Sequence, residues 1–387
     1  MNAGLLRRVL AALLLAAAQG PWASSAALAA TFVNPIVEAA AGTGSADPSI
    51  VLERGYYYYC RAIGDAAIGV ARARRLQDIG AARVAVVFRP PADAPYSRQL
   101  WAPELERIGS RWYIYFTASD GNDASHRMYV LQSLGSDPRG PYRLKARLAP
   151  QPDGWAIDGI AIRLHGRLYF VWSGWRADHA GFPQNLYIAR MSNPWTVVGE
   201  RHLLAAPDRA WEQAGAPLLE APELLRHGAS TFIVYSASAS WGDDYALGAL
   251  AYLGGDPLAQ ASWRKLPGPL FGKNPAAGVF SVGHVSFVTS PDGREDWIVY
   301  HATSRPGAGW RERSVRAQRF GWEADGLPHF GAPVGAGVAI EAPGPARPAP
   351  APQGPPLSPR APPRTRSSPA SRCADGCRRR PGPRTSA

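Results

Sequence analysis

Three carboxylates in the central part of the sequence have the residue types and the spacing needed for acid–base chemistry. Asp47, Asp158 and Glu220 each stand upstream of a similar aromatic segment, although each alone also fits an ordinary turn or loop. If the fold brings them together, their like charges raise the pKa of at least one of them. One carboxyl group could then donate a proton while another acts as a base, which is what hydrolysis of a glycosidic bond requires.

The third carboxylate and nearby aromatic residues extend this hypothesis. Like-charge repulsion from a third carboxylate can keep the acid protonated at neutral pH, and the same group can orient the acid. An acid and a base about 6.5–9.5 Å apart leave room for a water molecule, and hydrolysis then inverts the anomeric configuration. Aromatic side chains would offer apolar faces to a sugar, although we expect Trp172 to lie in the core. The candidates are Trp101, Trp172, Trp175 and Trp241.

The segments that must position these residues are short and rich in aromatic and β-branched residues. This pattern predicts an all-β domain over residues 31–340. Five segments align without gaps, each ends in Ala or Gly, and the steps between their ends are 56, 56, 63 and 65 residues. They are Tyr56–Ala62, Trp112–Ala118, Leu168–Gly174, Thr231–Ala237 and Asp296–Ala302. Five units of this kind, each with room for four short strands, predict a five-bladed β-propeller.

A turn Gly before each aromatic segment sets the expected register. Counting back eight residues from this Gly reaches Asp47, Trp101, Asp158 and Glu220 in the first four units, and the matching residue of the fifth unit is His284, nine residues back. The first strand of each propeller blade lines the central axis. We therefore expect these five residues to meet at one mouth of the channel, provided that no register slips by a residue.

The two ends of the chain differ in composition from this central domain. Arg7 and Arg8, an apolar run over residues 9–18 and the sequence Ala-Leu-Ala at 27–29 predict a secretory signal peptide over residues 1–30. The protein is therefore expected to be secreted or periplasmic. Residues 341–387 contain 13 Pro and nine Arg, which predicts a disordered tail.

Charge and cysteine usage argue against several functions. Much of the formal net charge of +12 lies in the two ends, so the weakly charged centre does not predict a nucleic-acid groove. The apolar run is shorter than the roughly 20 residues that span a bilayer, so no membrane anchor is expected after signal cleavage. Cys60 is expected to be a buried apolar residue, and Cys373 and Cys377 lack the further ligands that zinc needs.

Several motifs together resemble the family 43 glycoside hydrolases, whose members are inverting five-bladed propellers. The resemblance extends over residues 34–334. Its main motifs are Ala46-Asp47-Pro48, Trp101-Ala-Pro-Glu104, Trp155-Ala-Ile-Asp158-Gly159, Leu219-Glu220-Ala-Pro222, Gly283-His284-Val-Ser-Phe287 and Ser314-Val-Arg-Ala-Gln318. Within the family, Phe170-Val-Trp-Ser-Gly-Trp175 and the segment 184–191 look most like the exo-acting α-L-arabinofuranosidase branch.

The resemblance implies a role for each catalytic candidate. Asp47 would be the general base and Glu220 the general acid. Asp158 would adjust the pKa and the orientation of the acid. Many relatives have Asn-Glu-Gly-Pro where this chain has Leu219-Glu220-Ala221-Pro222, so the acid loses a polar neighbour and the freedom of a Gly.

The resemblance also implies substrate contacts. Arg316 resembles an Arg near the sugar-binding floor, and Asn185 resembles a substrate contact. His284 corresponds to an axial His that in some members helps to hold a central ion, often calcium, although no cofactor is required. The expected substrate-binding residues are Trp101, Trp175, Asn185, His284 and Arg316. Glu223 lies three residues after Glu220, so on a regular strand it would face the opposite side, and we expect it to be structural.

The sequence therefore predicts a secreted inverting hydrolase that releases terminal α-L-arabinofuranosyl residues from plant cell-wall arabinan, arabino-oligosaccharides or arabinoxylan. A β-xylosidase or an endo-α-1,5-arabinanase of the same family is the alternative, and the loops at the mouth would decide between them. The motifs of a retaining invertase-type propeller are absent from the sequence. A non-catalytic sugar-binding propeller would be expected to lose one of the three acids. No oligomeric state is predicted.

Overall fold

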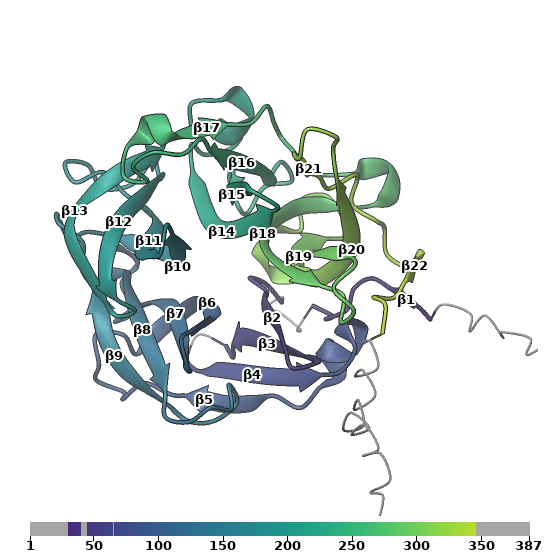
Figure 1. Ribbon diagram of the computed structural model, residues 1–387, viewed down its shortest axis with the longest axis horizontal. Helices are drawn as coiled ribbons and strands as arrows, with labels where there is room; N and C mark the ends of the chain where they lie inside the picture. The colour runs from purple at the N-terminus through teal and green to yellow at the C-terminus, as the bar shows by residue number, and fades with distance from the viewer. Residues whose placement is uncertain (1–29, 40–44, 65, 346–387) are drawn as a thin grey trace, which may run out of the picture. The chain divides into compact units, whose positions relative to one another are not determined.

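The fold is organised around a central axis. The structure is a computed structural model that describes residues 30–39, 45–64 and 66–345. Over these residues the strands form five four-stranded sheets and one two-stranded sheet. Figure 1 shows the five larger sheets arranged around the axis as blades. The predicted all-β, five-bladed propeller is confirmed.

Each blade consists of four consecutive antiparallel strands that run from the axis outward. Blade 1 contains β2 (Ser49–Glu53), β3 (Tyr56–Ala62), β4 (Ile68–Ala73) and β5 (Ala85–Phe88). Blade 2 contains β6 (Arg98–Ile108), β7 (Arg111–Ser119), β8 (Arg127–Ser133) and β9 (Tyr142–Leu148). Blade 3 contains β10 (Ala156–Leu164), β11 (Arg167–Gly174), β12 (Asn185–Asn193) and β13 (Thr196–Ala205). Blade 4 contains β14 (Leu219–His227), β15 (Ser230–Ala237), β16 (Ala246–Tyr252) and β17 (Trp263–Lys265). Blade 5 contains β18 (Phe280–Thr289), β19 (Asp296–Thr303), β20 (Ser314–Trp322) and β21 (Pro328–His329).

The remaining regular elements are short 3₁₀ helices in the connections. They are η1 (Leu76–Ala81), η2 (Asp123–Ser125), η3 (Ala210–Gln213), η4 (Gln260–Ser262), η5 (Pro275–Ala277) and η6 (Gly309–Glu312). Among the described residues, no helix is long and apolar enough to cross a membrane.

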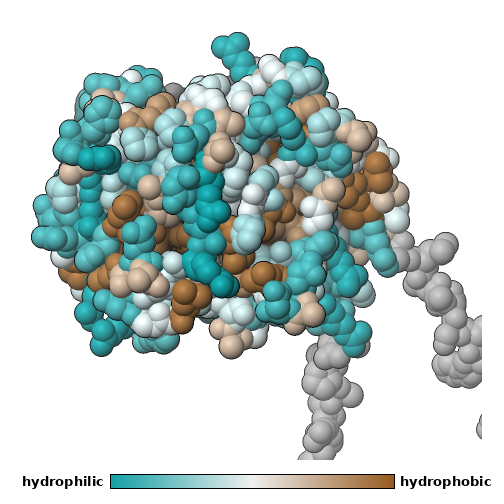
Figure 2. All heavy atoms as spheres, turned by 90° about the horizontal axis from the view of Figure 1, so that it is seen from above, coloured by the Kyte–Doolittle hydropathy of each residue, from teal (hydrophilic) through white to brown (hydrophobic). Residues whose placement is uncertain are grey.

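The aromatic second strands supply the hydrophobic core between the blades. Trp172 of β11 is buried and lies between the rings of Phe170 and Tyr187, so its predicted place in the core is confirmed. Cys60 of β3 is buried as expected. The face seen in Figure 2 is mainly hydrophilic, with hydrophobic residues scattered among the polar ones.

The N-terminal segment closes the ring of blades. Strand β1 (Thr31–Val33) pairs with β22 (Ala339–Glu341). The Asn34 side chain then binds both backbone groups of Ala317 in blade 5, donating to the carbonyl at 3.0 Å and accepting from the amide at 2.9 Å. These contacts fasten the start of blade 1 to blade 5.

The innermost strands share an irregularity that lies near the axis. Pairing with the second strand skips residues in β6, β10, β14 and β18. At each of these bulges, and two residues before β2 begins, a non-glycine residue has positive φ, a conformation that costs roughly 1–2 kcal/mol. These residues are Asp47 (φ 50°), Ala102 (43°), Asp158 (53°), Ala221 (49°) and His284 (44°).

The register expected from the turn Gly differs by one residue from the observed register in two of the blades. Gly55 and Gly166 are the second residues of their two-residue turns, whereas Gly109 and Gly228 are the first residues of theirs. The count of eight therefore reaches the strained position in blades 1 and 3, but one residue before it in blades 2 and 4. Glu220 consequently precedes the position that Asp47, Asp158 and His284 occupy.

Candidate active site

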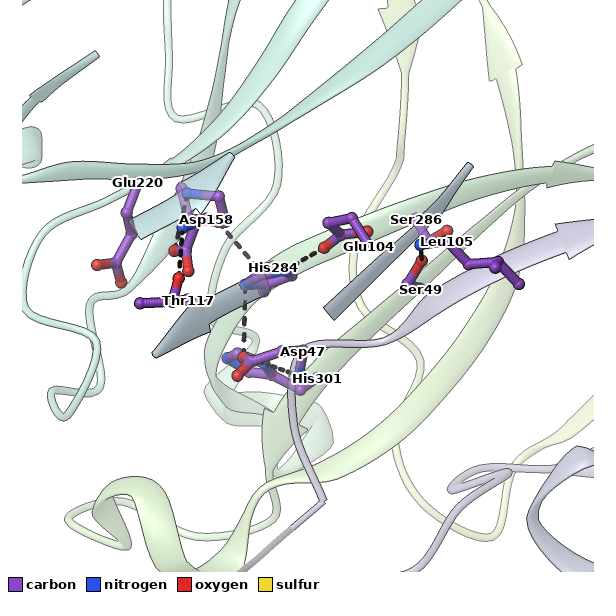
Figure 3. Close-up of polar contacts among 12 residues, drawn as sticks. Asp47, Ser49, Glu104, Leu105, Thr117, Asp158, Glu220, His284, Ser286 and His301 are labelled. Carbon is purple, nitrogen blue, oxygen red and sulfur yellow. Dashed lines mark hydrogen bonds and ion pairs between the residues drawn. The ribbon is translucent and has the colours of Figure 1, made fainter. Parts of the chain in front are cut away.

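The three predicted carboxylates come from three blades and gather around one His. Asp47 precedes β2, Asp158 lies in the bulge of β10, and Glu220 lies at the start of β14. Figure 3 shows Glu220 beside Asp158 and places His284 between Asp158 and Asp47. The structure therefore brings the predicted acids and the predicted axial His together at the start of the innermost strands.

Cationic and neutral nitrogen groups surround Asp47. Its Oδ1 atom lies 3.4 Å from His284 Nδ1, 3.3 Å from His301 Nδ1 and 3.4 Å from Arg313 Nη1. The backbone amide of Asp47 also donates to His301 Nδ1 at 3.2 Å. Burial alone would raise the pKa of this carboxyl, but the positive charges of His284 and Arg313 hold it well below its usual range.

The two His residues next to Asp47 carry different charges. Burial would lower the pKa of His284, but Asp47 and the hydrogen bond with Glu104, 2.9 Å from Nε2, raise it to about 10. Burial and the neighbouring Arg313 lower the pKa of His301 to about 3. At neutral pH, His284 is therefore an imidazolium, His301 is neutral and Asp47 is ionised.

Glu220 occupies a different environment from Asp47. Its side chain is held by Tyr245, whose hydroxyl donates to Oε1 at 2.8 Å, and by Gln184, whose Nε2 donates to Oε2 at 3.0 Å. Gly283 allows the Tyr245 ring to approach, because a Cβ at residue 283 would lie 1.9 Å from Tyr245 Cε1. The residue is only 8% exposed, and burial raises the pKa of Glu220 despite these two hydrogen bonds.

Asp158 fixes the backbone next to Glu220. Its Oδ2 atom accepts a hydrogen bond from the Ala221 amide at 3.2 Å, and its own amide donates to Thr117 Oγ1 at 3.1 Å. Burial raises the pKa of Asp158 well above its usual value, and the charge of Glu220 adds to this effect. Burial therefore favours the protonated forms of both carboxyls.

The starts of the innermost strands of blades 1, 3, 4 and 5 are each held by a side chain of the preceding blade. In each of the four cases the supporting side chain is the sixth residue of the predicted aromatic segment. It lies one or two positions before the end of the second strand. The four pairs are Thr117 Oγ1 with the Asp158 amide, Ser173 Oγ with the Leu219 carbonyl at 2.6 Å, Ser236 Oγ with the His284 amide at 2.8 Å, and His301 Nδ1 with the Asp47 amide. A backbone held in this way can keep a strained conformation at the site.

The predicted aromatic substrate residues lie in a row formed by blades 2 and 3. Trp101 stacks on His126 at 3.9 Å between ring centroids, and Trp155 stacks on Trp175 at 4.5 Å with nearly parallel planes. The two pairs meet edge to face, because the ring centroids of His126 and Trp155 are 6.2 Å apart in a T-shaped arrangement.

Among the described residues, the other two predicted substrate residues form no hydrogen bond with the carboxylates. Asn185 Nδ2 lies 3.4 Å from the Tyr187 hydroxyl, and Arg316 Nη2 donates to Ser304 Oγ at 2.6 Å. Within the described part of the chain, Asn185 Oδ1 and Arg316 Nη1 are buried without a hydrogen-bond partner. The Arg beside Asp47 is Arg313, and the amide beside Glu220 is that of Gln184.

Four contact residues were not predicted from the sequence: Gln184, Tyr245, His301 and Arg313. His301 carried a signal, because it is the sixth residue of its aromatic segment, where blades 2 to 4 have Thr or Ser. Gln184 is the first residue of the matched segment 184–191, and Arg313 directly precedes the motif that begins at Ser314. Tyr245 lies in a connection without a motif, and only the fold places it beside Glu220.

Carboxylates flank the ring of His284, the residue at which the resemblance implied a central ion in some members. Both ring nitrogens face carboxylates, Asp47 on one side and Glu104 on the other. Calcium takes six to eight oxygen ligands, and the described ranges contain no group of three or more His, Cys, Asp or Glu side chains that could hold a metal.

Glu223 lies on the channel below the carboxylate cluster. It lines a cavity of about 520 Å³ together with Glu104 and Glu106. Burial, with Glu104 and Glu106 nearby, raises the pKa of Glu223 well above its usual value. The expected alternation between Glu220 and Glu223 does not apply, because the bulge lies between them.

The fold and the site define a class of protein. A five-bladed propeller with one ionised carboxylate, Asp47, and two buried carboxyls of raised pKa, Asp158 and Glu220, has the groups that a glycoside hydrolase needs. The chain belongs to the glycosyl hydrolases family 43, whose family model matches residues 32–328.

Relatives of known name support this placement. The chain is 34% identical to an extracellular exo-α-(1→5)-L-arabinofuranosidase of Streptomyces avermitilis, over 80% of this chain and 65% of that protein's length. It is 32% identical to a protein of the same name from Streptomyces chartreusis, over 70% of this chain and 83% of that one. The crystal structure of an α-L-arabinofuranosidase from Lactobacillus brevis matches with a TM-score of 0.74 and 31% identity, over 79% of this chain and 98% of that chain.

Proposed function

We propose that this glycoside hydrolase is an α-L-arabinofuranosidase that releases terminal arabinofuranosyl residues from arabinan, arabino-oligosaccharides or arabinoxylan. The names of the relatives support the sugar. The observation that carries the chemistry is the opposite perturbation of two carboxyls, because the pKa of Asp47 is lowered and that of Glu220 is raised. One site thus offers a base and an acid at the same pH.

The proposed reaction is a single displacement. Asp47 accepts a proton from a water molecule, whose oxygen attacks the anomeric carbon. Glu220 donates its proton to the glycosidic oxygen as the bond to the leaving group breaks. Asp158 orients Glu220 through the Ala221 amide, and the product sugar has inverted configuration.

Groups around the carboxylates support a sugar substrate. The aromatic row of blades 2 and 3 offers flat apolar faces beside polar groups. The buried Oδ1 of Asn185 and Nη1 of Arg316 lack partners in the described chain and could be satisfied by sugar hydroxyls.

Proton NMR during hydrolysis of an aryl α-L-arabinofuranoside tests the sugar and the stereochemistry together. We expect the first-formed arabinose to show the inverted anomeric signal. A retained signal would overturn the single displacement, and absence of turnover would overturn the proposed sugar.

Two matched variants test the roles of the acid and the base. Asp47→Asn should abolish turnover of all substrates, because water is then not activated. Glu220→Gln should be partly rescued by aryl leaving groups that need little protonation. Equal losses for both variants with good and poor leaving groups would contradict the assignment.

We also propose that the protein is secreted. The relatives from Streptomyces are named as extracellular, and the sequence of residues 1–30 has the pattern of a signal peptide. This predicted signal peptide, except Ala30, and residues 346–387 of the predicted tail lie outside the described residues.

A further inference from the structure

An exposed aromatic cluster stands next to the acid side of the site. We propose that Phe182, Trp241 and Trp310, here called the aromatic ledge, bind the sugar units of the leaving group when the substrate is an α-1,5-linked arabino-oligosaccharide or arabinan. This inference rests on the proposed function and adds a subsite to it.

The ledge consists of three large side chains that the fold leaves in solvent. Phe182, Trp241 and Trp310 are 42%, 43% and 52% exposed. Trp241 lies 6.4 Å from Phe182 and 5.6 Å from Trp310 between ring centroids, and the two Trp rings are nearly perpendicular. Contiguous exposed aromatic groups on a soluble protein commonly mark a ligand-binding surface.

The ledge lies on the same face of the propeller as the carboxylates. Its members belong to the connections β11–β12, β15–β16 and β19–β20. In each blade the first strand starts at the mouth, and the second strand runs back to it because the pairing is antiparallel. The connection after the second strand therefore emerges at the mouth.

Each of these connections also contacts a catalytic carboxylate. Phe182 is two residues from Gln184, and Trp241 is four residues from Tyr245, which are the two hydrogen-bond donors to Glu220. Trp310 is three residues from Arg313, which contacts Asp47.

The position next to Glu220 indicates which part of the substrate the ledge contacts. An acid that protonates the glycosidic oxygen must face the leaving group. The sugars beyond that oxygen therefore extend across the connections that hold Glu220. The apolar face of a sugar ring can lie against an exposed indole. The aromatic row of blades 2 and 3 shares only Trp175 with these connections, since Trp175 and Phe182 both lie between β11 and β12.

Hydrogen bonds hold the ledge in place before a ligand arrives. Trp310 Nε1 donates to Ser240 Oγ at 3.2 Å, and Ser281 Oγ donates to the Ser240 carbonyl at 3.3 Å. The Gly307 amide donates to Asp243 Oδ1 at 2.8 Å, which ties the connections of blades 4 and 5 together. A preorganised surface loses less conformational entropy on binding.

Steady-state kinetics of Trp241→Ala and Trp310→Ala test the ledge. The substrates are an aryl α-L-arabinofuranoside, which has no second sugar, and α-1,5-linked arabinotetraose. We expect kcat/KM for the tetraose to fall about tenfold in each variant, mainly through KM, which corresponds to about 1.4 kcal/mol. Turnover of the aryl substrate should change less than about twofold, which also shows that the variants are folded.

A matched control is Leu253→Ala. Leu253 is 57% exposed and follows β16, so it lies on the face opposite the mouth. It should leave both substrates unaffected. Trp310→Phe should retain part of the tetraose activity because an aromatic face remains.

The outcomes separate this inference from the proposed function. If the native protein cleaves both substrates and the Trp variants lose nothing on the tetraose, or lose as much on the aryl substrate, the ledge is not a leaving-group subsite. If the native protein cleaves neither substrate, the proposed function fails and the ledge assignment fails with it.

Discussion

Replacing Tyr245 by Phe gives a sharp test of how the acid is tuned. The Tyr245 hydroxyl donates to Glu220 Oε1 at 2.8 Å in a buried setting. A donor stabilises the ionised carboxylate, so this bond lowers the pKa of Glu220 and its loss should raise it.

The size of the shift follows from the energy of the bond. A hydrogen bond to a charged group contributes about 1.5–3 kcal/mol, and one pKa unit corresponds to 1.36 kcal/mol. Gln184 still donates to the other oxygen, so we expect a rise of about one unit, near the lower end of this range. Because the acid must be protonated, the alkaline limb of the kcat/KM profile should move up by about one pH unit, while the acidic limb stays in place.

The assay is the pH dependence of kcat/KM on an unactivated arabino-oligosaccharide, where the acid is needed. Tyr235→Phe is a matched control, because the Tyr235 hydroxyl is also buried and donates to a different carboxylate, Glu212, at 2.7 Å. An alkaline limb that stays in place or moves down in Tyr245→Phe would refute the reasoning, as would an equal upward shift in the control.

Two further variants test the base and the strained backbone. Arg313→Met removes a cation that lowers the pKa of Asp47, so the acidic limb of the kcat/KM profile should move up by about one pH unit. The control Arg311→Met replaces an exposed residue and should not move this limb. An acidic limb that stays in place in both variants would argue against the ion pair. Ala221→Gly should relieve positive-φ strain of roughly 1–2 kcal/mol, offset by about 0.4–1 kcal/mol from the freer unfolded chain, so thermal unfolding should show Tm rising by about 2 °C. Ala249→Gly, in a buried strand without positive φ, should instead lower Tm, and a similar fall in Ala221→Gly would contradict the strain argument.

The repeats in the sequence were sufficient to predict the propeller and the residues that meet at its mouth. A period of about 60 residues constrains the architecture, and the acid-bearing motifs lie at the start of each unit. The count from the turn Gly was wrong by one residue in blades 2 and 4, because a Gly with positive φ can occupy either position of a two-residue turn.

The groups that tune the acids were harder to predict than the acids themselves. Tyr245 and Arg313 reach the carboxylates from connections whose paths depend on packing between blades, as in the contact of Gly283 with Tyr245. Arg316 matched a family motif, yet Arg313, three residues earlier, contacts Asp47. Sequence spacing therefore predicts where a residue lies around the propeller axis better than it predicts which residue of another blade contacts it.

The support of four innermost strands by side chains of the preceding blade has a consequence for engineering by module exchange. The amide of Asp47 is held by His301 of blade 5, and the amide of Asp158 by Thr117 of blade 2. A blade moved alone into another propeller would bring its functional residue but leave the supporting side chain behind. The smallest transplantable unit therefore begins at the second strand of one blade and ends with the first strand of the next blade. Its boundaries fall between the first and second strands of a blade, not between two blades.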